Sequence, residues 1–322
     1  MLHIHPLVAP RRANRYFEVR LAREGLLLMP VLAMLLASML FASSNIGNKI
    51  AVADLAVAEV VSGRFLFAAA VLWAMVLLTR QPVVWKEARR PLLMGLLDPG
   101  LVSLLIVSGL QYTSAVNVAV FWALMPLFTP IAARLVLGEK INNLVILGAL
   151  VAVTGAIILA MANKDAGEGN LTGDFLAICG VLCAVGTALL GRRGAQTQGR
   201  PTVTTAWQMT MALGVAGSVL MVLEQPRETV ARLQEGPILL LAYLGMVALA
   251  GSFFLMNYAL RHLPAGHVAL FASLTGPLVL PMAAIILGET IQLWEVAAIA
   301  IVMVGVAIPS LVSGDLLARF RS

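Results

Sequence analysis

Apolar blocks of about 20 residues recur along almost the whole chain, and they restrict it to a small set of folds. About 20 consecutive apolar residues let one α-helix cross the hydrocarbon core of a bilayer. Ten such blocks are separated by short connections, and they lie near residues 26–46, 58–78, 91–110, 115–137, 143–162, 171–190, 202–223, 237–258, 265–287 and 293–313. The sequence therefore predicts an all-α membrane protein with ten transmembrane helices.

The composition excludes most other classes of protein. Of the 322 residues, 60 % are hydrophobic and only 12 % are charged, whereas a soluble domain carries about 25 % charged residues. The net charge of +6 does not indicate a nucleic-acid partner, because the basic residues lie in the short connections. We expect a lipid bilayer and a small-molecule substrate as partners, and no nucleic acid.

The distribution of Lys and Arg predicts the orientation in the membrane, because cytoplasmic loops carry the excess of these residues. With the N-terminus inside, the cytoplasmic segments hold 17 basic residues and the opposite side holds 4. We therefore expect a multi-pass protein of the inner (cytoplasmic) membrane. Residues 1–25 form a basic N-terminal segment and residues 314–322 a C-terminal tail, both cytoplasmic. A signal peptide cleaved near Ala42 is the alternative, but the repeat described next needs the first block as a helix.

An internal repeat relates the two halves at an offset of 150 residues. Ala115–Phe121 aligns with Ala265–Phe271, and Leu137-Gly138-Glu139 aligns with Leu287-Gly288-Glu289. Each copy, 26–162 and 171–313, contains five predicted helices. Because five is an odd number, the copies must lie in opposite orientations. Inverted repeats are typical of secondary transporters that work by alternating access.

These features resemble a known family. The ten blocks, the Ala-x-x-x-Ala-x-Phe segments, the proline pairs, the Gly-Glu helix ends and Gly173-Asp174 are similar to EamA-like ten-helix exporters of the drug/metabolite transporter superfamily. Within it, the chain resembles the bacterial aromatic amino acid exporters. The resemblance implies outward movement of amino acids, other metabolites or lipophilic cations. It also implies two inverted five-helix repeats around a central cavity, which the first to fourth and sixth to ninth helices surround while the fifth and tenth lie outside.

Asp98 is the only acidic residue well inside a predicted span, and Pro99 follows it directly. A carboxylate in the membrane interior is unfavourable unless it faces a cavity or a partner. We expect Asp98 to bind a substrate ammonium group or to carry a proton. The alternative is that the span begins later and that Asp98 caps it at the interface.

Proline pairs interrupt the fourth and ninth predicted spans. Prolines remove backbone hydrogen bonds and bend or break helices, and broken helices line the sites of many transporters. We expect Pro126, Pro130, Pro277 and Pro281 to act as hinges, the alternative being static kinks.

Other polar residues within the spans are candidates for contact with the substrate. Asn117 and His267 occupy equivalent positions in the two repeats, while Gln208 and Asn257 are uncharged hydrogen-bonding residues. The alternative for Gln208 and Asn257 is that they join helices to each other. For His267 it is a position at the membrane interface.

Aromatic rings near these residues suit a flat or cationic substrate, because they stack and bind cations. The candidates for the substrate site are Tyr112, Phe121, Trp122, Tyr258 and Phe271. The remaining tryptophans, Trp73, Trp85, Trp207 and Trp294, we expect in the interfacial belt.

The sequence lacks the motifs that several other functions require. The sequence has no nucleotide-binding G-x-x-x-x-G-K-[ST] motif and no H-E-x-x-H or G-x-S-x-G motif, so we expect neither an enzyme nor any cofactor or metal. Cys179 and Cys183, four residues apart in one apolar block, form neither a disulfide framework nor a zinc pattern. The sequence predicts a secondary exporter of small amphipathic metabolites, most of all aromatic or hydrophobic amino acids. An exporter of lipophilic cations is the alternative, and an intramembrane enzyme or a passive channel is less favoured.

Overall fold

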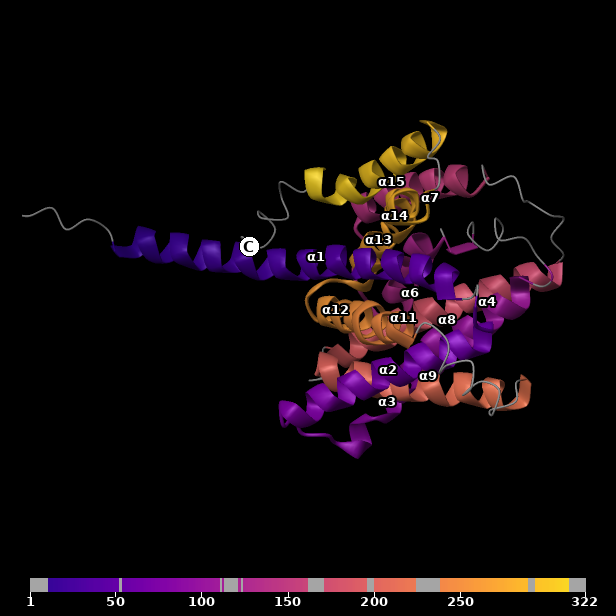
Figure 1. Cartoon of the computed structure of the whole chain (residues 1–322). Helices are drawn as coiled ribbons and strands as arrows, with labels where there is room; N and C mark the ends of the chain where they lie inside the picture. Colours follow the sequence, from indigo (N-terminus) through magenta and orange to yellow (C-terminus); the bar gives the residue numbers. More distant parts are fainter. Residues whose placement is uncertain are drawn as a thin grey trace, which may run out of the picture.

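The computed structural model describes residues 11–51, 54–110, 112, 121–122, 124–161, 171–195, 200–223, 238–288 and 293–312 (Figure 1). All regular structure in these ranges is helical. The helices are α1 (Arg11–Ala51), α2 (Val57–Leu78), η1 (Trp85–Glu87), α3 (Arg89–Gly95), η2 (Leu96–Leu101), α4 (Val102–Leu110), α6 (Met125–Leu137), α7 (Asn143–Met161), α8 (Leu171–Ala195), α9 (Pro201–Leu223), α11 (Ile238–Ala242), η3 (Tyr243–Leu249), α12 (Ala250–His262), α13 (Ala265–Ala272), α14 (Thr275–Leu287) and α15 (Leu293–Val312).

Six helical runs in the described residues are long and apolar enough to cross a membrane. They are Leu28–Asn48, Val57–Leu78, Leu171–Gly194, Pro201–Val222, Ile238–His262 and Ala265–Ile286. The third predicted span, 91–110, corresponds to α3, η2 and α4, which a break interrupts. The first helix exceeds its predicted range at both ends, because α1 begins at Arg11 and ends at Ala51.

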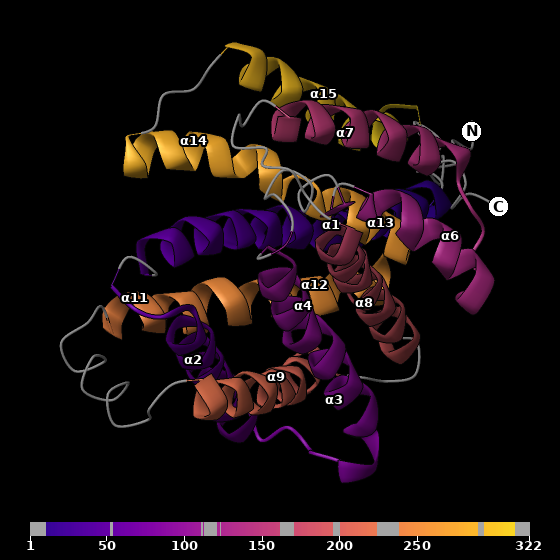
Figure 2. The same cartoon turned by 90° about the vertical axis from the view of Figure 1, so that its right-hand side faces the viewer.

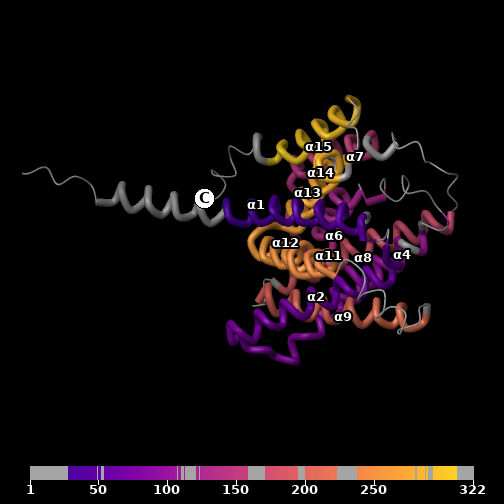
Figure 3. The backbone as a smooth tube through the Cα atoms, in the orientation of Figure 1, coloured from indigo at the N-terminus to yellow at the C-terminus, as the bar shows by residue number. Residues whose placement is uncertain are grey.

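Helices from opposite halves of the sequence pack against each other. The most extensive contacts pair α7 with α15, α2 with α9, α1 with α12 and α4 with α8. Helix α1 runs through the middle of the bundle, with α13 and α14 on one side and α12 on the other (Figures 1 and 3). Each half therefore finds most of its packing partners in the other half.

Helices α7 and α15 lie side by side at one edge of the bundle (Figure 2). Their axes approach closely because Gly148 of α7 faces the backbone of Gly305 of α15, where a side chain would collide. Small residues are the usual means by which membrane helices approach each other. Helices α7 and α15 correspond to the fifth and tenth predicted spans. Their position at the edge agrees with the peripheral place that the family resemblance implies for these helices.

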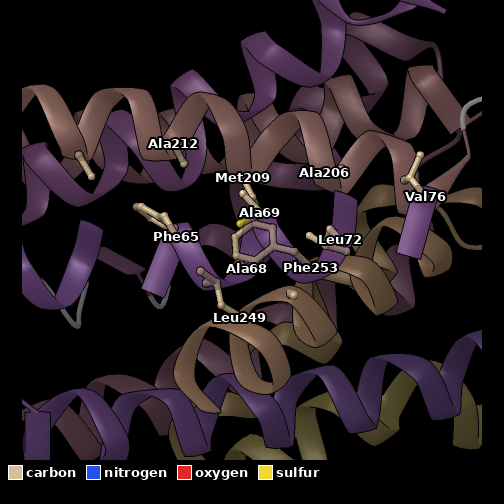
Figure 4. Packing of buried hydrophobic residues seen from close by; sticks show 12 residues of the cluster. Phe65, Ala68, Ala69, Leu72, Val76, Ala206, Met209, Ala212, Leu249 and Phe253 are labelled. Atoms are coloured by element: carbon tan, nitrogen blue, oxygen red, sulfur yellow. The ribbon is translucent and has the colours of Figure 1, made fainter. Parts of the chain in front are cut away.

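A core cluster joins α2, α9 and α12. Phe65 and Leu72 of α2 pack against Met209 of α9 and Phe253 of α12, with small alanines between them (Figure 4). Within a bilayer such packing stabilises through close van der Waals contact, since lipid tails are as apolar as the side chains. The cluster holds these three helices in a fixed relation, and two of them, α9 and α12, also carry polar residues described below.

Two glycines end helices in the same way, 150 residues apart. Gly138 follows α6 and Gly288 follows α14, and each has φ 69° in the left-handed region. Glycine adopts this conformation without the steric penalty of a Cβ atom, which makes it the common residue after a helix. The predicted role of the Gly-Glu pairs as helix ends is thus confirmed for both glycines.

The prolines lie at helix starts as well as within helices. Helix α6 begins at Met125 after a turn at Leu124, and α14 begins at Thr275 after a turn at Ser273 and Leu274. Pro126 and Pro277 therefore stand in first turns, where a missing N–H is tolerated, and not in the middle of continuous helices. Pro130 and Pro281 lie inside α6 and α14.

Candidate substrate site

The third helical run breaks at Asp98. This residue has φ −142° and ψ 119° between the helical residues of η2. The cause is local, because the ring of the following Pro99 disfavours the helical conformation at the residue before it. The break frees the carbonyl group of Asp98 from the helix ladder, and the carboxylate is half-buried inside the bundle. Asp98 lies within the helical run formed by α3, η2 and α4, and its role in binding, like the alternative of an interfacial cap, stays a prediction.

Gln208 of α9 binds the freed carbonyl group. Its Nε2 donates a hydrogen bond of 2.9 Å to the backbone oxygen of Asp98, and its side chain is fully buried. The helices approach closely here because residue 95 is glycine. A Cβ atom on Gly95 would overlap the backbone oxygen of Gln208.

Asn257 of α12 extends the network to a third helix. Its Nδ2 donates to Oε1 of Gln208 at 3.0 Å and to Oγ1 of Thr205 at 3.0 Å. Asn257, Gln208 and Thr205 are all buried. We call the connected groups of Asp98, Gln208, Asn257 and Thr205 the polar chain. It contains three residues that the sequence predicted for the substrate site.

A cavity of about 500 Å³ adjoins the polar chain and has Asn257 in its wall. It is formed by the segment from Pro82 to Met94, the end of α8, the start of α9 and the end of α12. These segments lie at the end of the bundle that the sequence predicts to face the cytoplasm. Among the charged residues that line the cavity are Lys86, Glu87, Arg89, Arg90, Arg200 and Arg261.

Trp207 is a cavity residue that the sequence analysis assigned to the interfacial belt. Its side chain is buried, and its ring packs edge-on against Trp73 and Trp85, with centroids 4.9 Å and 5.0 Å away. Trp207 lies near the start of α9, and its position at the membrane interface stays a prediction.

An ion pair lies beside the cavity. Nε of Arg192 is 2.6 Å from Oε1 of Glu139, and Nη1 of Arg192 donates to the carbonyl oxygen of Leu260 at 2.9 Å. The sequence analysis gave Glu139 no role beyond a helix end. His267 is half-buried, and it interacts electrostatically with both Glu139 and Arg192.

The remaining predicted site residues are not gathered at the polar chain. Tyr112 follows α4 and is exposed. The ring of Tyr258 lies 4.6 Å from that of His262, and the carbonyl oxygen of Phe271 accepts a hydrogen bond from Ser38. Among the described residues, the cavity lining includes none of Tyr112, Phe121, Trp122, Tyr258, His267 and Phe271. Asn117 lies outside the described residues.

The apolar helices, the break in the third run and the buried polar chain define a multi-pass membrane protein of the transporter type. The chain belongs to the EamA-like transporter family, whose sequence model matches residues 28–161 and again residues 171–311.

Known proteins agree with this assignment. The chain is 25 % identical over 250 residues to the uncharacterized transporter YyaM of Bacillus subtilis, covering 76 % of this chain and 81 % of YyaM. It is 24 % identical over 221 residues to the uncharacterized transporter YcxC of the same organism, covering 66 % and 70 % of the two chains. A solved crystal structure with 16 % sequence identity matches the fold with a TM-score of 0.70, covering 91 % of this chain and 99 % of that chain.

Proposed function

We propose that this transporter expels small amphipathic metabolites, above all amino acids with aromatic or hydrophobic side chains, from the cytoplasm. The observation that carries the proposal is the polar chain at the broken third run, next to a cavity at one end of the bundle. A carboxylate, two amides and free helix ends together suit a zwitterion, which needs both charge and hydrogen bonds.

Alternating access is the mechanism we propose, with ten helices arranged as two inverted five-helix repeats, 26–162 and 171–313. The family model matches the chain twice, and the glycine helix ends recur 150 residues apart. We place both termini in the cytoplasm and the protein in the inner membrane, as the distribution of Lys and Arg favours.

The breaks before Pro126 and Pro277 are the proposed hinges. The two prolines lie at corresponding places in the two halves, and in the second half the break before Pro277 separates α13 from α14. Pro130 packs near Gly266 of α13, so a tilt of α6 would be transmitted to the ninth predicted span. Transport would open the polar chain to one side and then to the other.

Asp98 would hold the ammonium group of the substrate. A hydrogen bond to a charged group contributes about 1.5–3 kcal/mol, and loss of 1.4 kcal/mol is about a tenfold change in affinity. The exporter of lipophilic cations is less favoured, because a cation would have to pass the basic residues of the cavity.

Counterflow in liposomes tests the proposal. Labelled tryptophan is placed outside and unlabelled amino acids inside, and we expect accumulation that saturates and that competing amino acids abolish. Asp98→Asn should reduce the exchange at least about tenfold, whereas Asp54→Asn, which changes an exposed carboxylate, should leave it unchanged. Accumulation driven only by a lipophilic dication would assign the protein to the cation exporters.

A further inference from the structure

Basic side chains from separate parts of the chain converge on the cavity at the predicted cytoplasmic end. Lys86, Arg89 and Arg90 come from the segment before and within α3, Arg200 precedes α9, and Arg261 lies at the end of α12. Glu87 is the acidic residue among them. A hollow lined by charges of one sign focuses the electrostatic field and concentrates ions of the opposite sign.

Trp207, which lines this cavity, carries a buried hydrogen-bond donor. Nε1 of Trp207 is shielded from solvent and has no hydrogen-bond partner among the described residues. The indole N–H can only donate, and the edge-on contacts with Trp73 and Trp85 hold the ring in place. An oxygen acceptor from a bound molecule would satisfy this group.

The tendency of basic residues to lie on the cytoplasmic side explains the sign of these charges. It does not explain why they surround one hollow, nor why that hollow contains an unsatisfied indole N–H. The neighbouring tryptophan Trp73 shows the usual arrangement, since its Nε1 donates to Oγ1 of Thr210 at 2.9 Å.

We propose that this cavity is an oxyanion site that receives the carboxylate of the exported solute on the cytoplasmic side. The indole N–H of Trp207 donates to one carboxylate oxygen, and the surrounding guanidinium groups neutralise the charge. Asn257 belongs both to the cavity wall and to the polar chain, so a solute bound here stands at the start of a polar path toward Asp98. This inference rests on the proposed function, because it needs a substrate with a carboxylate.

Binding to the purified full-length protein tests the site. The affinity for tryptophan and for tryptamine, which lacks the carboxylate, is measured in wild type, in Trp207→Phe and in Arg200→Gln/Arg261→Gln. Phenylalanine keeps an aromatic ring in the cluster and removes the N–H donor together with part of the ring volume, and the unchanged binding of tryptamine shows whether the lost volume matters. Arg134→Gln is the matched control, because Arg134 is an exposed basic residue of α6 and is not among the cavity residues.

We expect tryptophan binding to weaken on the order of tenfold in both cavity variants, as a lost charge-assisted hydrogen bond implies. Tryptamine binding should not change, and Arg134→Gln should behave as wild type. Unchanged tryptophan affinity in both cavity variants would overturn the site while leaving amino acid export intact. Absence of tryptophan binding and counterflow in wild type would instead overturn the proposed function itself.

A lipid headgroup offers a similar oxyanion, and the lipid environment separates the two sources. The same measurements are made in nanodiscs of phosphatidylcholine and of phosphatidylglycerol. Equal affinity for tryptophan in the two kinds of nanodisc supports the proposal that the cavity binds the carboxylate of the solute. If the anionic lipid alone abolishes tryptophan binding, and the cavity variants remove that competition, the hollow holds a headgroup phosphate and the proposal is wrong.

Discussion

Arg192 and Glu139 form an ion pair of 2.6 Å across 53 residues of sequence. Both side chains are only 16 % exposed, so the pair is screened less than one at the surface. Arg192, near the end of α8, also donates a hydrogen bond to the carbonyl oxygen of Leu260 near the end of α12. Its two bonds therefore connect the segment after α6 with the ends of α8 and α12. Gly191 and Arg261, the neighbours of these bonded residues, line the cavity.

Neutralising either partner of this ion pair should destabilise the described conformation. We expect Glu139→Gln and Arg192→Gln each to lower the free energy of unfolding by about 1–3 kcal/mol, because the remaining partner stays partly buried and unpaired. Thermal unfolding in detergent measures this. Lys140→Gln, at the exposed neighbour of Glu139, should have little effect. The reversed pair Glu139→Arg/Arg192→Glu should recover part of the loss, and a strictly additive double variant would contradict a direct interaction.

Removing Asn257 should break the polar chain at its centre. Asn257→Leu leaves Oε1 of Gln208 buried without the Nδ2 donor, which costs about 1–3 kcal/mol. Gln208→Leu should have a similar effect. The free energy of unfolding of the double variant should fall by less than the sum of the two single losses, because both substitutions remove the same hydrogen bond. The midpoint of unfolding in the four proteins checks this, and full additivity would mean that the two amides act independently.

A methyl group at residue 95 should separate α3 from α9. Gly95→Ala places a Cβ atom against the backbone oxygen of Gln208, and overpacking of this kind destabilises by about 1–3 kcal/mol. We also expect lower transport, since the bond from Gln208 to Asp98 spans the same contact. Gly217→Ala on α9 is the control, because nothing lies within 4 Å of its added Cβ. Equal stability of the two variants would show that the helices are not closely packed at this point.

Thiol labelling should establish the orientation. In a background of Cys179→Ala and Cys183→Ala, single cysteines replace Asp54 and Thr79, which are both exposed. A membrane-impermeant maleimide should label Asp54→Cys in intact cells and Thr79→Cys only after permeabilisation, if the N-terminus is cytoplasmic. The reverse pattern would invert the proposed topology and would place the cavity outside.

Much of the helix arrangement could be predicted from local features. Long apolar runs, glycines at helix ends and a proline after Asp98 act through the backbone of a few neighbouring residues, so they are visible in the sequence. Asp98, Gln208 and Asn257 were conspicuous because polar groups inside apolar helices need partners. Their mutual contact, however, depends on how three helices pack.

Trp207 and the pair of Glu139 with Arg192 could not be predicted for the same reason. Helix α9 is apolar on most sides, so its sequence does not show which face points toward the protein and which toward lipid. The contacts of Trp207 with Trp73 and Trp85 therefore became visible only in the structure. Glu139 and Arg192 meet only because α6 and α8 come together in the bundle.

The packing of α7 on α15, α2 on α9, α1 on α12 and α4 on α8 has a consequence for how the chain matures. The halves before and after residues 162–170 are units of sequence, but each packs its helices mainly against the other half. During synthesis the packing surfaces of the first half should therefore contact lipid until the second half has been synthesised. Two fragments produced together from a gene divided in this connection should find each other and assemble, whereas either fragment produced alone should be degraded.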